Sequence, residues 1–530
     1  MGRYVFTNGK IYTASGRRPF CQALAVLGKR VLLAGSEAEI DAVVDDSFER
    51  IDLKGRALIP AFSDSHIHFM FFSLGMSGVD LDGAASVEDA AARVAKAVEA
   101  AKPGTWVLGS GWNKNAWPGG ELPDRSYLDA VAPKNPVAMF SKDLHLVWVN
   151  TAALRLAGVG IDTPDPEGGE IVRDEETRQA TGILKEAAAD LVRRVIPEPT
   201  SEATAAAMEK GMAQLHAFGI AAIHNMEGAS AFQAFQLLRN SGRLKLRVTS
   251  AIAKENLDDA LDMGLSTGFG DEWLRIGPLK IFADGALGSQ TAHLLRPYEG
   301  NPRNTGIAVT SKEEIAELVG RAVLGGISCA VHAIGDRANR EVLSIFESVR
   351  EESGRRRLRH RIEHAQLLHP DDVRKFADVG VVASMQPVHI LTDIPAADRH
   401  WGKRSRWTYA FRSLIKSGAT LAFGSDAPVE TPNPIHGIYA AVARRRLDGT
   451  PDAGWYPEER LTVEETVRAY TAGAAAAVGE ELTRGTLSRG SLADIAVLSR
   501  DIFSMPAAEI PEAHVVATMV GGEFVFRKDL

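Results

Sequence analysis

Eight short apolar segments, separated for the most part by helical segments, run through the sequence from residue 58 to residue 427. Segments this short and apolar are typical of buried parallel strands, because helices cover both faces of such a sheet. Eight strand–helix repeats favour an α/β fold of the (β/α)8 TIM-barrel type. A doubly wound open sheet is the alternative, but no glycine-rich phosphate fingerprint follows the first segment. The segments are LIPAFSDSH, GIAAIHNM, LRVTSAIA, LKIFADG, ISCAVHAIG, RHRIEHA, VVASMQP and ATLAFGSDA.

Both ends of the chain are rich in short β-type runs. Around Asn8-Gly9 and Gly521-Gly522, apolar runs flank two residues that tolerate positive φ, which predicts a β-hairpin at each place. We expect residues 1–60 and 483–530 to form one small composite β-sandwich domain, beside a barrel over residues 61–482. Two unrelated edge hairpins are the alternative. Residues 70–215 carry mostly helical patterns and are expected to form an insertion between strands one and two.

Composition and charge exclude several classes of protein. The 530 residues contain 60 Lys+Arg and 68 Asp+Glu, a net charge of −8, whereas nucleic-acid binding favours a basic face. No run approaches the ~18 consecutive apolar residues of a membrane span. Cys21 and Cys329 are too few for a disulfide framework or a Cys-rich zinc module.

The N-terminus lacks the pattern of a signal peptide, so we expect a cytoplasmic protein. Its expected partner is a small-molecule substrate, without nucleic acid or membrane, and the sequence leaves a homodimer open. The run Arg355-Arg356-Arg357 lies among acidic neighbours, and a solvated helix-to-strand loop explains it.

Polar side chains gather at the carboxyl ends of the expected strands, where barrel enzymes place their active sites. His66 and His68 share one face of strand one, because residues i and i+2 of a strand point the same way. His332, His364 and Asp426 follow the apolar runs of strands five, six and eight. Imidazole and carboxylate together suit zinc, iron, manganese or nickel. The sequence therefore predicts a metal centre at this end of the barrel.

Longer motifs surround these positions and extend over most of the chain: PAFSDSHIH, SKDLHLVWVNTAAL, TGILKEAA, LKIFADGALGSQTA, HAIGD, RIEHAQ, SMQP and FGSDAPV. Their order resembles the amidohydrolase superfamily of metal-dependent hydrolases. The exact residues of these motifs are similar to those of amidohydrolase family 3, the branch that contains N-substituted formamide deformylase and exoenzyme-regulation-like proteins.

The resemblance implies a metal-dependent hydrolase of carbon–nitrogen bonds other than peptide bonds, of the amide type. His66 and His68 would hold the more buried of one or two divalent ions, with zinc as the first choice. His332 and His364 would hold a second ion or act on the substrate side. Asp426 would contact the metal and serve as general base and acid toward a metal-activated water.

Two neighbouring metals need a bridging anion, and binuclear relatives supply it with a carboxylated lysine on strand four. Lys280 lies at that point of the strand count between apolar neighbours, so the resemblance implies an N6-carboxylysine there. A salt bridge from Lys280 to Asp284 is the alternative. Glu186 is a rival for the bridging carboxylate, although its helical surroundings favour a helix-face residue or a substrate contact.

Further residues are expected around the substrate. Asp143, His145, Glu186 and Gln386 are predicted substrate contacts, although relatives commonly show Asp-Gly-His where this chain has Asp143-Leu144-His145. Asp336 and Glu363 are candidates to orient the ligand histidines next to them.

Two other functions remain as alternatives. One is a deaminase of a cyclic amidine or nucleobase-like substrate on the same scaffold. Aromatic-base deaminases usually carry a glutamate shortly after the histidine of strand five, whereas this chain offers only Asp336. The other is a non-catalytic metal-binding module. It is disfavoured because a chain that had lost its catalytic activity should also have lost metal ligands, whereas all five predicted ligand residues are present.

Overall fold

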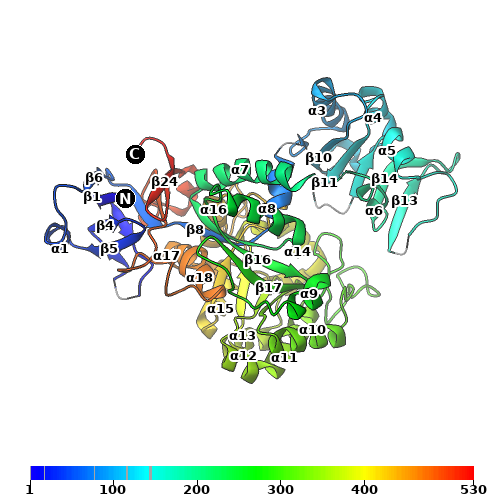
Figure 1. The fold of residues 1–530 in the computed structure, drawn as a ribbon. Helices are drawn as coiled ribbons and strands as arrows, with labels where there is room; N and C mark the ends of the chain where they lie inside the picture. Colours follow the sequence, from blue (N-terminus) through cyan, green and yellow to red (C-terminus); the bar gives the residue numbers. More distant parts are fainter. Residues whose placement is uncertain are drawn as a thin grey trace. The chain divides into compact units, whose positions relative to one another are not determined.

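The centre of the chain forms the expected barrel of eight parallel strands (Figure 1). This computed structural model describes residues 2–16, 18–76, 78–114, 117–142, 146–166, 168–197 and 199–530. The segment after the last strand joins the first strand through backbone hydrogen bonds from Asp426 N to His66 O (2.7 Å) and from His68 N to Ala427 O (2.9 Å). In their order around the sheet, the strands are β8 (Phe62–Ile67), β15 (Ile220–Asn225), β16 (Arg247–Ala253), β17 (Leu274–Phe282), β18 (Cys329–Ala333), β19 (Arg361–His364), β20 (Val382–Met385) and β21 (Leu421–Phe423).

Helices alternate with these strands. Every residue of β8 and β15 is buried, as expected of strands covered on both faces. In α10, Ser311 caps the first turn by accepting a hydrogen bond from Glu314 N, and the helix buries an apolar face that includes Val319. None of the described helices is both long and apolar enough to cross a membrane. These helices are α8 (Ala229–Asn240), α9 (Leu257–Asp262), α10 (Lys312–Leu324), α11 (Asp336–Ser348), α12 (Arg350–Arg356), α13 (Val373–Val379), α14 (Ile390–Trp401), α15 (Phe411–Ser417), α16 (Pro434–Ala443), α17 (Val463–Arg468) and α18 (Ala474–Ala477).

The two ends of the chain build a composite β-sandwich of two sheets. One hydrophobic core joins them, with Phe6 and Leu24 from the first sheet beside Ile495 and Val516 from the second. The first sheet has the order β5 (Arg30–Gly35), β4 (Ala23–Leu27), β1 (Arg3–Thr7) and β6 (Glu49–Asp52), and α1 (Glu37–Asp41) follows β5. The second has the order β24 (Glu523–Arg527), β23 (Val515–Val520), β22 (Ile495–Leu498), β7 (Ala57–Pro60), β2 (Lys10–Tyr12) and β3 (Phe20–Cys21).

One of the two predicted hairpins is wrong. β23 and β24 pair antiparallel around Gly521-Gly522, as predicted. The strands on either side of Asn8-Gly9 belong to different sheets, since β1 pairs with β4 and β6 while β2 pairs with β3 and β7. The short connection crosses between sheets because each strand buries its apolar side chains in the common core rather than against its sequence neighbour.

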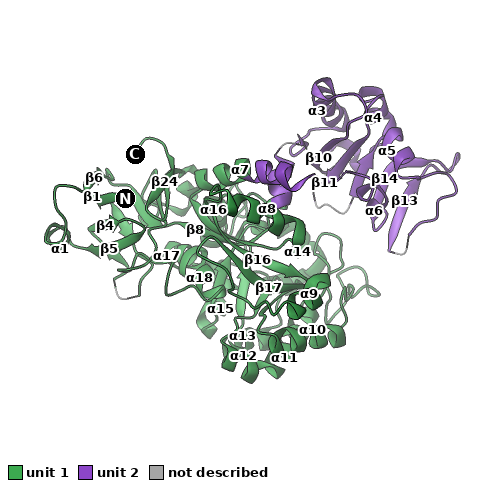
Figure 2. Ribbon diagram, viewed as in Figure 1, with its two compact units in different colours: residues 1–69, 209–530 green, residues 70–208 purple. Residues whose placement is uncertain are grey.

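Residues 70–208 form a separate compact unit (Figure 2), and its mostly helical character was predicted wrongly. It contains a six-stranded sheet, and residues 183–186, expected to be helical, lie in a strand between two antiparallel neighbours. Sheet pairing therefore outweighs the helix propensity of the Leu-Lys-Glu run. The sheet order is β13 (Gly169–Arg173), β14 (Ala180–Glu186), β12 (Leu146–Val149), β11 (Val137–Ser141), β10 (Val107–Trp112) and β9 (Val79–Asp80). The helices between residues 69 and 217 are α2 (Phe69–Gly75), α3 (Val87–Ala100), α4 (Arg125–Val131), α5 (Thr151–Leu156), α6 (Ala189–Arg193) and α7 (Ser201–Ala217).

Gly424 lies where the segment after β21 meets β8. A Cβ atom on this residue would lie 2.5 Å from His66 N and 2.7 Å from Asp64 Oδ1. Both distances are shorter than van der Waals contact, and one of the two atoms belongs to the backbone. Only a residue without a side chain lets the two strands approach this closely.

We therefore expect Gly424→Ala to force these strands apart and to destabilise the protein by about 1–3 kcal/mol, the usual cost of overpacking. The measurement is the melting temperature followed by circular dichroism. Gly320→Ala in α10 is the matched control, because nothing lies within 4 Å of its added Cβ. Equal melting temperatures for the two variants would contradict this account of the closure.

Candidate metal centre

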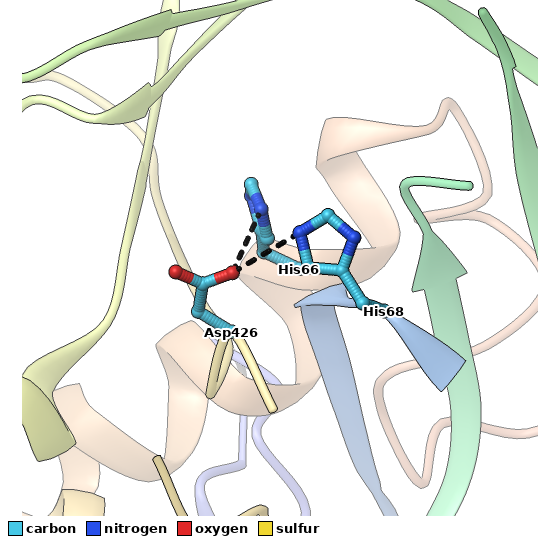
Figure 3. Close-up of side chains that lie close together, drawn as sticks. All are labelled: His66, His68 and Asp426. Atoms are coloured by element: carbon cyan, nitrogen blue, oxygen red, sulfur yellow. Dashed lines mark ion pairs between the residues drawn. The ribbon is translucent and has the colours of Figure 1, made fainter. Parts of the chain in front are cut away.

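His66, His68 and Asp426 come together at the carboxyl ends of the barrel strands (Figure 3). His66 is buried at the end of β8, His68 follows β8, and Asp426 lies in the loop after β21. Asp426 Oδ1 lies 3.3 Å from His66 Nε2 and 3.4 Å from His68 Nε2. Side chains from the first and last strands thus present three ligand atoms to one point.

The spacing of these atoms fits a divalent ion. Two ligand atoms bound about 2.0–2.1 Å from a tetrahedral ion lie about 3.3–3.4 Å from each other. The two imidazole–carboxylate distances match this value, and the three candidate ligand atoms all lie within 4.8 Å of one another. Imidazole nitrogen and carboxylate oxygen are ligand atoms that zinc, iron, manganese and nickel all bind.

Glu363 orients the first of these histidines. Its Oε2 lies 2.5 Å from His66 Nδ1, so that nitrogen carries the hydrogen and Nε2 keeps its lone pair toward Asp426. Ser384 Oγ donates to the same oxygen at 2.8 Å. Burial alone would raise the pKa of Glu363, but the nearby Arg361 and His66 hold it well below its usual value. The carboxylate therefore stays ionised.

Arg361 supports this carboxylate and was not singled out from the sequence. It is fully buried in β19 and donates to both oxygens of Glu363, to Ser65 O and to His224 Nδ1 (2.8 Å). Pairing and hydrogen bonding offset the cost of burying its charge. Arg361 and Glu363 share one face of the buried strand β19, so the sequence signal was an opposite-charge pair at positions i and i+2 of an expected barrel strand.

The histidines of β18 and β19 lie beside this group. The ring of His364 lies 4.5 Å from that of His332 and 4.9 Å from that of His66, measured between centroids. His332 Nε2 donates to Gly285 O (3.0 Å), which leaves the lone pair on Nδ1. Burial lowers the pKa of His332 to about 3, and that of His364 well below its usual value. Both imidazoles are therefore neutral near pH 7, the form that binds a metal.

Lys280 is buried in β17 beside the same group. Its Nζ has no hydrogen-bond partner among the described residues, and it lies 4.7 Å from the ring centroid of Phe282. Asp284, the alternative salt-bridge partner, instead accepts three backbone N–H groups at 2.8–2.9 Å. Burial lowers the pKa of Lys280 to about 8. An unpaired buried amine of this kind is costly unless it is neutral or modified.

Comparison with known proteins identifies the family of this chain. The model of the amidohydrolase family matches residues 49–526. The chain belongs to the amidohydrolase family. Protein LONG AFTER FAR-RED 3 of Arabidopsis thaliana is 34% identical over 98% of this chain and 91% of its own length. N-substituted formamide deformylase of Arthrobacter pascens is 28% identical over 97% of this chain and 96% of its own length.

A solved structure shares both fold and sequence with this amidohydrolase. It is an uncharacterized metal-dependent hydrolase from Pyrococcus horikoshii OT3, 30% identical, with a TM-score of 0.80 over 96% of this chain and 99% of that chain. Membership of the family makes this chain a hydrolase on the amidohydrolase scaffold and confirms the family 3 resemblance. Family membership alone does not specify which bond the enzyme cleaves.

Two expected roles need correction. Glu363 was expected to orient the adjacent His364 but bonds to His66, because neighbouring residues of a strand point to opposite faces. Gln386 was expected to contact substrate. It is buried, and its Oε1 accepts a hydrogen bond from His364 Nδ1 (2.8 Å), so it orients His364 instead.

The other expected contacts lie in residues 70–208 or elsewhere on the barrel. Glu186 is an exposed residue at the end of β14, not on a helix. Asp143 and His145 lie outside the described residues. Asp336 Oδ1 accepts a hydrogen bond from Leu295 N (2.8 Å), and His332 Nε2 is bonded to Gly285 O rather than to Asp336.

We expect Glu363→Gln to weaken metal binding by about 10–100-fold, because a neutral amide no longer fixes the hydrogen of His66 on Nδ1. Metal affinity would be measured by competition with a chelator, and the melting temperature would be recorded alongside it. Ser384→Ala removes one hydrogen bond to Glu363 and should have a smaller effect in the same direction. Glu347→Gln, at an exposed position of α11, is the matched control. Unchanged affinity in Glu363→Gln would contradict the orienting role.

Proposed function

We propose that this amidohydrolase cleaves amide-type carbon–nitrogen bonds, other than peptide bonds, in a small-molecule substrate. The observation that supports the proposal most strongly is the convergence of His66, His68 and Asp426 at the spacing of a metal centre. The proposed cofactor is zinc, as one ion or two, with His332 and His364 as further ligands or substrate-side groups. A divalent ion bound there would polarise the substrate carbonyl and lower the pKa of a nearby water.

Asp426 is the proposed general base and acid. Burial alone would raise the pKa of this carboxyl, but the neighbouring imidazoles of His66 and His68 hold it well below its usual value. Asp426 is therefore ionised near neutral pH and able to accept the proton of the attacking water. Passing that proton to the departing nitrogen turns the nitrogen into a neutral amine, which leaves readily.

Two observations favour amide hydrolysis over deamination. One relative that matches nearly the whole chain is named for removing a formyl group from substituted formamides. A deaminase would need a proton donor after the histidine of strand five, and Asp336 there already accepts a backbone hydrogen bond from Leu295. These observations support a substrate with a linear N-acyl or N-formyl group.

The test is an assay of metal-replete enzyme on N-formyl amines, N-acyl amines and cyclic ureides, with adenosine as the deamination substrate. We expect turnover of an N-formyl or N-acyl amine. Asp426→Asn should lower that turnover by about 10²–10⁴-fold, the usual contribution of a general acid–base group, while most of the metal is retained. Asp46→Asn, at an exposed position, controls for the loss of a carboxylate. Turnover of adenosine alone, or full activity in Asp426→Asn, would refute the assignment.

We further propose that Lys280 carries a carboxyl group from CO₂ and bridges two metal ions. A pKa lowered to about 8 makes more of the amine neutral near pH 7–8, and only the neutral amine adds CO₂. The addition forms an N–C bond and releases one proton. The resulting carbamate would satisfy a nitrogen that otherwise has no partner among the described residues.

If this holds, Lys280→Ala should lose one of two equivalents of metal and most activity, because the bridging anion is removed. Added formate or acetate should restore part of the activity by taking the place of the carbamate. Metal content, measured by mass spectrometry, shows whether one equivalent of metal is lost, which activity alone cannot show. Lys254→Ala, on the surface in a pair with Glu314, is the control. Unchanged metal content in Lys280→Ala would count against the carbamate.

A further inference from the structure

A cavity of about 450 Å³ opens at the end of the barrel opposite the metal centre. Its walls come from the segments that precede β18 and β19, from the first half of β17 and from the end of α18. Four arginines line it: Arg275, Arg356, Arg357 and Arg359. No carboxylate is present among the described residues of its lining. Cationic side chains thus dominate the lining, while Glu352, Glu480 and Glu481 pair with three of the arginines from outside it.

The ion pairs of these arginines leave donors available. Arg356 uses Nε for Glu352, Arg359 uses Nη2 for Glu481, and Arg275 uses Nε for Glu480. Arg357 forms no ion pair with any described residue. It also has φ of +58°, in the left-handed region that usually suits glycine at the end of a helix.

Hydroxyl groups complete the lining. Thr267 and Ser328 both line the cavity, and their side-chain oxygens lie 3.2 Å from each other. The Thr267 hydroxyl already donates to Gly277 O (3.0 Å), so the arginines supply the donors for a ligand. Guanidinium groups match phosphate through paired N–H donors. A volume of about 450 Å³ lies in the range of small-molecule sites. Bare phosphate would leave much of it empty.

We propose that this cavity binds the phosphate group of a small phosphate ester. The strands that begin at its walls are β17, β18 and β19, which carry Lys280, His332 and His364 toward the metal centre. The site is thus separate from the catalytic groups but connected to them through three continuous strands. This inference does not depend on which bond the enzyme cleaves.

The test is arginine labelling of the metal-replete enzyme with phenylglyoxal, followed by peptide mass spectrometry. Glycerol 3-phosphate is the probe, with glycerol and potassium chloride at equal ionic strength as controls. We expect the probe to slow labelling of Arg357 and Arg359 while Arg355 reacts as before. Arg355 is the internal control because it belongs to the same run, pairs with Glu351 and does not line the cavity.

Calorimetry with the same probe gives the second readout. Arg357→Gln should weaken binding by about ten-fold, the value of a lost charge-assisted hydrogen bond, and Arg355→Gln should leave it unchanged. Equal protection of all three arginines would overturn the proposal, because it would indicate diffuse screening. Equal affinity in Arg357→Gln would also overturn it, because the probe would then bind elsewhere, as at the metal centre.

A lipid headgroup offers the same phosphate chemistry as a free ester. A parallel labelling with phosphatidylcholine vesicles that contain phosphatidic acid separates the two sources. Protection by glycerol 3-phosphate supports a soluble ester. Protection by the vesicles alone would overturn it, since the phosphate would then be presented by a membrane surface.

Discussion

The hydrogen bond from the backbone N–H of Asp426 to the carbonyl oxygen of His66 joins the last strand region of the barrel to the first. It closes the sheet and, in the same contact, sets the Asp426 carboxylate beside His66 and His68. Gly424 makes the close approach possible because it has no Cβ to meet the opposing strand. Closure of the fold and assembly of the metal centre are therefore one structural event.

Charge balance beneath the metal centre follows from burial. Arg361 and Glu363 lie on one face of β19, are fully buried and form an ion pair. Glu363 in turn accepts the hydrogen bond that orients His66. A buried charge without a partner would be costly, so each of these two residues stays charged because the other neutralises it. Lys280 breaks the pattern, because its nitrogen has no partner among the described residues. That imbalance supports the proposal that this lysine is modified.

Local patterns predicted structure well where local forces decide it. The eight barrel strands appear where short apolar runs predicted them, and the Gly521-Gly522 hairpin forms. The Asn8-Gly9 hairpin does not, because β1 and β2 enter different sheets of the sandwich. Residues 183–186 pair as a strand although they were expected to be helical. In both cases one of the pairing partners is far away in the sequence, since β2 pairs with β7 and β14 with β12, and no local pattern carries that information.

The sequence by itself determined the strand–helix order of the barrel and the places of the candidate ligand residues at strand ends, because periodicity and residue chemistry are local properties. It did not determine which groups orient which ligands. Glu363 serves His66 and Gln386 serves His364, each across a strand boundary. Those pairings depend on the register of neighbouring strands and on burial, which exist only once the barrel has closed. The tertiary structure alone also left Lys280 without a hydrogen-bond partner among the described residues and gathered four arginines around one cavity.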